Sequence, residues 1–398
     1  MVLKIKNIII LFLFATTSWL GWKAYNYFFD TQPPTMNILG LEGDQYYCAD
    51  IQCLVSIDKA GEMSVWLDNK PLLSKFKVDT AGQEYPFIIP TRTVSNGKHN
   101  IKLLFTDNTF RKNKTSLTKD FYVDNIPLQA AFIQKETDYK VLQGRTLHLQ
   151  FQVNKKIKSA QVEALSKVYS CFPESERSSI YEAFIPIACE EPPNEYLVSV
   201  NIKDKVGNIL NLENKFQVIP FPFKKTTLHV ESKKVEEERE LGKNAALLEV
   251  AIKELVDKSP QQKLWRGTFC TPIEIARTTC EFGVIRTTQE KGKYQHKAVD
   301  IINTPKSVVW ASQSGIVVLK DRFENSGNTV IVDHGWGIMS MYFHLDSFAN
   351  IEVGQKITQG NPIGTIGKTG YASGYHLHWE LRVNNIAVDP MQWTKQGF

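Results

Sequence analysis

The sequence predicts a mainly β protein with an N-terminal helix, two β-sandwich modules, a linking helix and a C-terminal domain built on an antiparallel β-sheet. Short runs rich in valine, isoleucine, phenylalanine and tyrosine alternate with turn residues through most of the 398 residues, as β-strands and their connections do. The first thirty residues contain one long apolar run, and residues 222–262 are instead rich in helix-forming residues. These observations set the fold class.

Composition and charge exclude two broad classes of protein. The chain is 42% hydrophobic and 22% charged, as in a folded protein rather than a disordered one. Its net charge of +5 is mild for this length and is not the signature of a nucleic-acid-binding protein. A weakly basic protein does suit work near an anionic surface or polymer.

Residues 1–29 are predicted to be a short cytoplasmic N-terminus followed by a transmembrane helix. Two lysines precede a charge-free run at residues 7–22, and the apolar and aromatic stretch as far as Phe29 is long enough for a bilayer core of about 30 Å. A cleaved signal peptide needs small residues after its apolar core, whereas tryptophans and tyrosines stand there. We therefore expect an uncleaved, single-pass anchor in the cytoplasmic (inner) membrane. The bulk of the chain would lie outside the cytoplasm, in the periplasm if the envelope has two membranes.

Residues 36–125 and 126–221 are predicted to form two β-sandwich modules. Strand candidates such as CLVSID and HNIKLLFTD in the first, and TLHLQFQV and EYLVSVNIKD in the second, are separated by turns at a spacing of roughly 8–12 residues. Both segments end with a turn containing Asp and Asn before a last strand, and in this they resemble the immunoglobulin-like modules of bacterial surface proteins. We expect them to act as spacers or to bind a protein regulator.

Residues 222–262 are predicted to be a helical linker. The apolar side chains follow a 4-3-4-3 spacing, the stripe of an amphipathic helix, and Pro260 ends it. The stripe is too short for a coiled coil, so we expect it to pack on the following domain or to strap the domains together. It consists of Leu241, Ala245, Leu248, Ile252 and Leu255.

The six cysteines fall into three local pairs, which predict disulfides in an oxidising compartment. No C-x-x-C is present, so zinc ribbons and thioredoxin-like redox sites are not expected. The alternative is that the cysteines are buried free thiols. The pairs are Cys48 with Cys53, Cys171 with Cys189, and Cys270 with Cys280.

The C-terminal domain, residues 263–398, holds the candidate chemistry. Strand-like runs are punctuated there by glycines, which suit tight turns. Five of the chain's eight histidines fall between residues 296 and 378. Such clustering points to a metal site rather than to scattered surface histidines.

Two short segments supply the candidate ligands. His296 and Asp300 lie four residues apart, whereas His376, His378 and Glu380 alternate along a predicted strand and project to one side of it. Both histidines of the pair could reach one ion, or one could ligate while the other serves the reacting centre. Two imidazoles and one carboxylate suit Zn²⁺ and leave the site with a net charge of about +1, which keeps the metal Lewis-acidic.

These segments resemble the lysostaphin-type (LytM-like) zinc metallopeptidases of bacterial cell walls, over nearly the whole C-terminal domain. Several motifs occur in the family's order, and only Ala298 departs, where the family usually has glycine in H-x-G-x-D. The motifs are FGVIR (282–286), HKAVDI (296–301), GNTVIVDHG (327–335), YFHL (342–345), VGQKI (353–357), GKTG (367–370) and HLHWE (376–380).

The resemblance implies roles for five residues. It makes His296, Asp300 and His378 the zinc ligands and His344 and His376 the catalytic histidines that do not bind the metal. We interpret His334 as structural and Ser373 as a turn residue. Glu380 is either a partner of a ligand ring or a solvated strand carboxylate.

The implied function is that of a membrane-anchored zinc endopeptidase that hydrolyses peptide cross-links of peptidoglycan. A second possibility is a non-catalytic LytM-like protein that activates separate cell-wall amidases, but such regulators have lost zinc ligands that this chain retains. A third, an adhesin in which the β-modules matter most, leaves the histidines unexplained.

Overall fold

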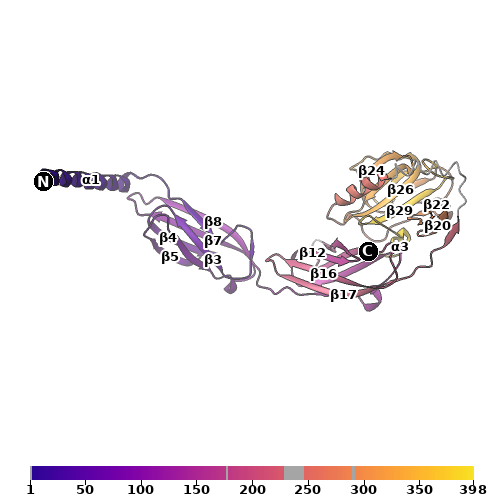
Figure 1. The fold of residues 1–398 in the computed structure, drawn as a ribbon, viewed down its shortest axis with the longest axis horizontal. Coiled ribbons are helices and arrows are strands. Elements are labelled where there is room, and N and C mark those ends of the chain that lie inside the picture. The colour runs from indigo at the N-terminus through magenta and orange to yellow at the C-terminus, as the bar shows by residue number, and fades with distance from the viewer. Residues whose placement is uncertain (1, 176–177, 228–245, 289–291) are drawn as a thin grey trace. The chain divides into compact units, whose positions relative to one another are not determined.

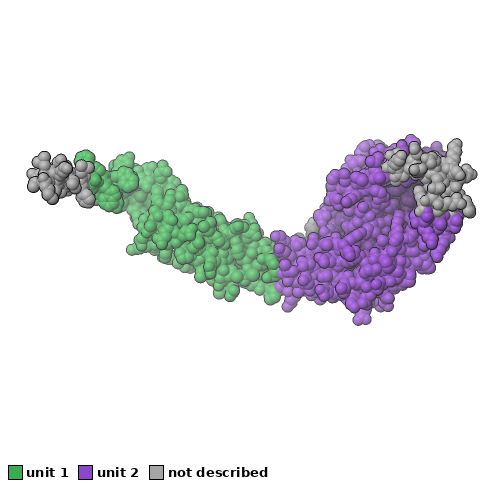
Figure 2. All heavy atoms as spheres, in the orientation of Figure 1, with its two compact units in different colours: residues 1–127, 205–208 green, residues 128–204, 209–398 purple. Residues whose placement is uncertain are grey.

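The computed structural model describes residues 2–175, 178–227, 246–288 and 292–398. The chain is mainly β, as predicted (Figure 1). It divides into two compact units, one formed by residues 1–127 with 205–208 and the other by residues 128–204 with 209–398 (Figure 2).

The chain begins with the helix α1 (Val2–Phe29), as the apolar N-terminal run predicts. Among the helices of the described residues, however, none combines the length and the apolar character needed to cross a membrane.

The first unit contains two β-sheets that pack face to face on one core, a β-sandwich. Inward residues alternate with outward ones, so that Ile51, Cys53, Val55 and Ile57 of one strand all enter the core between the sheets. The smaller sheet consists of β1 (Met36–Leu39), β3 (Ile51–Ile57) and β6 (Glu84–Ile89); the larger of β2 (Tyr46–Tyr47), β8 (Lys114–Val123), β7 (Gly97–Asp107), β4 (Gly61–Leu67) and β5 (Lys70–Val78); the 3-10 helix η1 spans Thr91–Thr93.

A second sandwich opens the second unit, and its two sheets also share one core. One sheet consists of β10 (Lys140–Leu142), β17 (Ile209–Ile219), β16 (Glu195–Asp204), β12 (Ile157–Ala164) and β13 (Lys167–Ser170). The other consists of β14 (Phe172–Pro173), β15 (Ile180–Pro186), β11 (Thr146–Val153) and β9 (Ala130–Phe132), and the 3-10 helix η2 spans Glu136–Tyr139.

The C-terminal domain is built on an antiparallel sheet, as predicted, with ten strands among the described residues. Its main path runs β19 (Arg277–Cys280), β22 (Val299–Ile302), β29 (Leu377–Val383), β26 (Ile338–Phe348), β25 (Gly327–Asp333), β24 (Gly315–Phe323) and β27 (Lys356–Ile357). Joined to this path are β23 (Val308–Trp310), β28 (Pro362–Ile366) and β30 (Ile386–Val388). A small sheet of β18 (Lys225–Thr227), β20 (Ile285–Thr288) and β21 (Gly292–Gln295) and the helix α3 (Pro390–Lys395) complete the domain.

The linker helix packs on this domain, as its apolar stripe predicts. The described part of the helix covers residues 246–257. Leu248 and Ile252 are buried and Leu255 is partly buried, against Met341 and Phe343 of β26. The other two residues of the predicted stripe, at positions 241 and 245, lie outside the described residues.

The second sandwich and the C-terminal domain pack together within one unit. Phe184 of β15 enters an aromatic cluster with Trp265, Trp336 and Trp393. Beside it the backbone N–H of Thr146 donates to Oε1 of Gln392 at 2.8 Å, and the Gln392 amide donates back to the Thr146 carbonyl at 2.9 Å.

The disulfide prediction is wrong: all six cysteines lie in the described residues and are free thiols. In the first predicted pair, Cys53 points into the sandwich core whereas Cys48 is exposed. In the second, Cys171 packs on the core of the second sandwich and Cys189 on the core of the C-terminal domain. Neighbours in sequence are thus directed into different surroundings.

The third predicted pair is separated in the same way. The Cys270 thiol donates to the Ala311 carbonyl at 3.6 Å, whereas Cys280 lies beside His296 and Asp300. The cysteines therefore give no support for an oxidising compartment.

Candidate metal centre

The centre lies on one face of the large sheet, where the four strands β19, β22, β29 and β26 run side by side. Asp300 of β22 pairs with His378 of β29 on one side and with Cys280 of β19 on the other. His378 pairs in turn with Phe343 of β26. Because directly opposed residues of adjacent strands share a face, this register forms a row of four side chains across the sheet.

His296 completes the group from the connection between β21 and β22. Its Nε2 lies 3.1 Å from Oδ2 of Asp300, and its Nδ1 lies 3.3 Å from the carbonyl oxygen of Glu281. If Nδ1 donates to that carbonyl, Nε2 is the nitrogen left with a lone pair. The ring is therefore oriented as a metal ligand requires.

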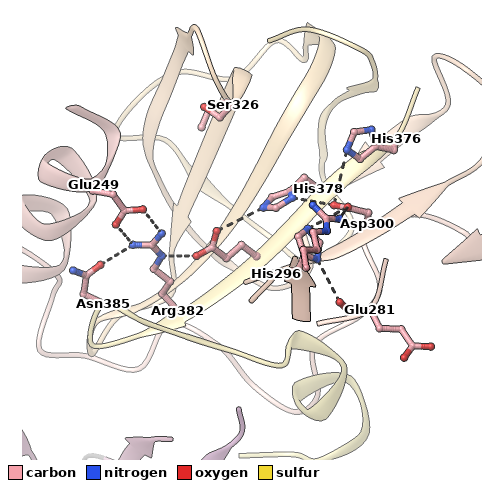
Figure 3. Close-up of polar contacts among 12 residues, drawn as sticks. Glu249, Glu281, His296, Asp300, Ser326, His376, His378, Arg382 and Asn385 are labelled. Atoms are coloured by element: carbon pink, nitrogen blue, oxygen red, sulfur yellow. Dashed lines mark hydrogen bonds and ion pairs between the residues drawn. The ribbon is translucent and has the colours of Figure 1, made fainter. Parts of the chain in front are cut away.

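His378 presents its other nitrogen to the same carboxylate. Its Nδ1 lies 2.9 Å from Oδ1 of Asp300, and its Nε2 lies 3.8 Å from Oε2 of Glu380 (Figure 3). The ring is stacked on Phe343, with centroids 5.2 Å apart and planes 5° apart. Two imidazole nitrogens thus approach the two oxygens of one carboxylate.

The electrostatics of this group are those of a tight cluster of opposite charges. Burial opposes protonation of His378, but its contacts with Asp300 and Glu380 raise its pKa to about 9. Burial likewise opposes ionisation of Asp300, yet hydrogen bonds from His296 and His378 hold the pKa of that carboxyl below its usual range.

A chain of charged residues connects His378 to the linker helix (Figure 3). Glu380 is buried and accepts from Nε of Arg382 at 2.5 Å. The other end of the Arg382 guanidinium donates to both carboxylate oxygens of Glu249, at 2.6 and 2.7 Å. Glu380 is therefore a buried partner of the His378 ring and not a solvated carboxylate, and the linker helix supplies the outermost member of the chain.

His344 and His376 lie close together beside the group, their ring centroids 4.8 Å apart. Nδ1 of His344 lies 2.9 Å from the Thr369 carbonyl, and Nδ1 of His376 lies 2.9 Å from the Gly374 carbonyl. Nε2 of His376 is 3.9 Å from Oδ1 of Asp300. Burial, with the adjacent His378 and His376, lowers the pKa of His344 to about 3, so that this ring is neutral near pH 7.

The backbone near these two histidines has an unusual conformation at His344 and a very close approach at Gly367. His344 has φ = 62°, a left-handed conformation that non-glycine residues seldom adopt. Gly367 pairs with His376, and a Cβ there would lie 2.1 Å from the backbone nitrogen of Asp346. Only glycine allows that close approach.

His334, the fifth histidine of the cluster, lies apart from the centre. It is fully buried, with Nδ1 2.7 Å from the Ser314 carbonyl and Nε2 2.8 Å from the Ser340 hydroxyl. Burial lowers its pKa to about 4. The contacts agree with the structural interpretation of this residue.

The donor set fits a transition metal such as zinc. His296, Asp300 and His378 offer two imidazole nitrogens and a carboxylate, which are the ligand types of catalytic zinc sites. Within the described residues, one cluster of three side chains has all its ligand atoms within 4.8 Å of one another: Cys280, His296 and Asp300. The sequence did not indicate Cys280 as a candidate metal ligand, because its pairing with Cys270 predicted a disulfide instead. Its position two residues before the start of the FGVIR motif was the available signal.

Comparison with known proteins supports this reading of the C-terminal domain. Residues 294–390 match the model of Peptidase family M23. A peptidoglycan DD-endopeptidase, ShyC of Vibrio cholerae, is 30% identical over 121 residues, which cover 30% of this chain and 28% of the relative. The murein hydrolase activator EnvC of Escherichia coli is 33% identical over 105 residues, which cover 26% of this chain and 25% of the relative.

These alignments therefore span less than a third of either relative. Among solved structures, a Pseudomonas aeruginosa protein assigned to peptidase M23 aligns with 64% of this chain and 94% of its own length, at 22% identity and a TM-score of 0.45.

Proposed function

We propose, on the premise that residues 294–390 form a domain of Peptidase family M23, that this protein is a zinc metalloendopeptidase that hydrolyses peptide cross-links of peptidoglycan. The observation that carries the proposal is the convergence of His296, Asp300 and His378 with two further histidines at their side. The similarity to a DD-endopeptidase supports the substrate class.

His296 through Nε2, Asp300 through its carboxylate and His378 through Nδ1 would hold the zinc ion. When bound, zinc supplies a Lewis acid that polarises the scissile carbonyl and lowers the pKa of bound water to about 7. Phe343 and Glu380 keep the His378 ring in its ligating orientation.

His344 and His376 would handle protons and developing charge. In both, Nδ1 faces a backbone carbonyl, so the neutral ring carries its lone pair on Nε2. One of them orients or deprotonates the attacking water, and the other stabilises the oxyanion or protonates the leaving amine. Their closeness to each other and to Asp300 supports a shared role at one reacting centre.

The test is zinc quantification on the purified protein combined with digestion of purified peptidoglycan. The protein should carry one zinc and release muropeptides, whereas His296→Ala should lose the zinc and the activity together. Muropeptide release by zinc-free His296→Ala would refute the proposal.

The similarity to EnvC suggests a second function, activation of separate cell-wall hydrolases through a protein partner. The retained ligand set argues for catalysis instead. A zinc-loaded protein that releases no muropeptides alone but stimulates an added amidase would favour the regulator, and the β-modules would then be the candidate binding surface.

We further propose that the domain works on the outer side of the cytoplasmic membrane, where peptidoglycan lies. The lysines that precede the apolar run at residues 7–22, and the run itself, support export of the chain. The same apolar run is the segment that would hold the protein at the membrane. The exposed Cys48 provides the test. A membrane-impermeant maleimide should label it in intact spheroplasts as fully as in lysed cells, and labelling only after lysis would contradict export.

A further inference from the structure

Cys280 occupies the last place in the row of side chains that forms the metal centre. It lies on β19 directly opposite Asp300, which lies directly opposite His378. Since opposed residues share a face of the sheet, the thiol is on the same side as the proposed ligands. Its position is therefore set by strand register and not by a mobile loop.

The distances agree with metal coordination. The Cys280 Sγ, a ring nitrogen of His296 and a carboxylate oxygen of Asp300 all lie within 4.8 Å of one another. Ligand atoms around a tetrahedral zinc are roughly 3.5 Å apart, so small side-chain adjustments would bring these three atoms onto one ion. His378 lies outside this group of three and would reach the same ion from its position 2.9 Å from Oδ1 of Asp300. Thiolate sulfur is also a preferred zinc ligand.

Arg286 lies where it can balance the added negative charge. Its Nη2 donates to Oδ2 of Asp300 at 3.2 Å, on the oxygen that also faces His296. A thiolate next to a carboxylate would be disfavoured without positive charge nearby. The guanidinium and the metal together provide that charge.

We propose that Cys280 is a fourth protein ligand of the metal, which closes the resting site with a thiolate. The inference rests on the proposed function for the presence of the metal. Coordination forms a sulfur–metal bond, and the thiol proton leaves to solvent. Because two imidazoles, a carboxylate and a thiolate neutralise Zn²⁺, the closed site is less Lewis-acidic and has no position for water. The sulfur must leave before water can bind, so the thiolate is an inhibitory ligand.

The experiment uses the full chain loaded with Co²⁺ in place of zinc, because a thiolate bound to cobalt gives a near-ultraviolet charge-transfer band. The wild type should show the band, and Cys280→Ser should lose it while still binding one cobalt, with affinity lowered roughly tenfold or more. Cys270→Ser is the matched control. That thiol bonds to the Ala311 carbonyl and lies outside the metal group, so its loss should leave the band and the affinity unchanged.

A second measurement tests the inhibitory role. At saturating zinc, Cys280→Ser should release muropeptides faster than the wild type, and an unchanged or lower rate would overturn the closed resting site. A band that persists in Cys280→Ser, or is absent from cobalt-loaded wild type, would overturn the ligand assignment. If the wild type binds no more cobalt than His296→Ala, both this inference and the proposed function fail. If the wild type shows the band but neither it nor Cys280→Ser releases muropeptides, the ligand assignment is upheld and the proposed function is refuted.

Discussion

At the scale of single residues, His376 and His378 lie at one strand end but direct their rings to different partners. His378 directs Nδ1 to Asp300 at 2.9 Å, whereas His376 directs its Nδ1 to the Gly374 carbonyl and keeps Nε2 3.9 Å from the same carboxylate. We therefore expect His376→Ala to keep its zinc and to lose turnover by roughly 10²-fold or more. His378→Ala should lose both zinc and turnover. Zinc content and muropeptide release measured on the same preparations check this, and loss of zinc from His376→Ala would reverse the assignments.

His334 predicts a pH dependence of stability that has nothing to do with the metal. Its pKa is about 4 in the folded protein and about 6.5 in an unfolded chain. Between these values the unfolded chain binds more protons than the folded one, so stability falls as pH drops from about 6.5 towards 4. The loss from this residue should be on the order of 3 kcal/mol by pH 4.

Thermal unfolding of the wild type and of His334→Gln across that pH range measures the effect. The variant should be less stable at pH 7, where the neutral ring bonds to Ser314 and Ser340. Its melting temperature should also depend less steeply on pH. Equal slopes for the two proteins would contradict the buried neutral histidine.

At the scale of elements, the linker helix and β29 are joined by Arg382. This side chain is buried between Glu380 and Glu249, and Glu380 has its own contact with His378. Arg382→Leu leaves the Glu380 carboxylate buried without its cation, and we expect a loss of about 3–5 kcal/mol. Glu249→Gln removes only the outer, half-exposed partner and should cost about 1 kcal/mol or less.

Denaturant unfolding measures the loss of stability in each variant, and zinc affinity serves as a second readout. A similarly small loss of stability in both variants would mean that Glu380 is protonated or hydrated when Arg382 is absent. Weaker zinc binding by Arg382→Leu at unchanged secondary structure would show that the chain of charges positions His378.

At the scale of the whole molecule, the second sandwich and the linker helix are predicted to be required for the metal domain to fold. Phe172 stacks on Trp336 at 4.2 Å between centroids, and Phe184 shares the cluster of Trp265 and Trp393. A chain shortened to begin at Leu128 keeps these contacts and should stay monomeric and bind one metal. A chain shortened to begin at Leu264 exposes the aromatic cluster and should aggregate or lose metal.

Size-exclusion chromatography and metal content of the two shortened chains check this prediction. The chain beginning at Leu128 contains the whole second compact unit, together with residues 205–208, which group with the first unit. A monomeric, metal-loaded chain beginning at Leu264 would show that the family domain folds without its neighbours.

Local patterns in the sequence predicted much of this molecule. Alternation of apolar and polar residues indicated the sandwiches, and the spacing of Leu248, Ile252 and Leu255 predicted the packed face of the linker helix. Alternation also placed His376 and His378 on one side of a strand, because side-chain direction follows from strand geometry alone. The apolar N-terminal run likewise predicted the helix that spans Val2–Phe29.

Local patterns in the sequence could not predict which residues far apart in the chain come into contact. Cysteines close together in the chain suggested disulfides, but strand direction and register send them to separate places, and register brings Cys280 opposite Asp300 instead. The Glu249–Arg382 contact joins residues 133 positions apart, which no local pattern encodes. The sequence by itself thus determined which side chains were available for the chemistry and which way each faced on its own strand. Only the tertiary structure decided which of them meet, because the order and register of strands depend on packing across the whole sheet.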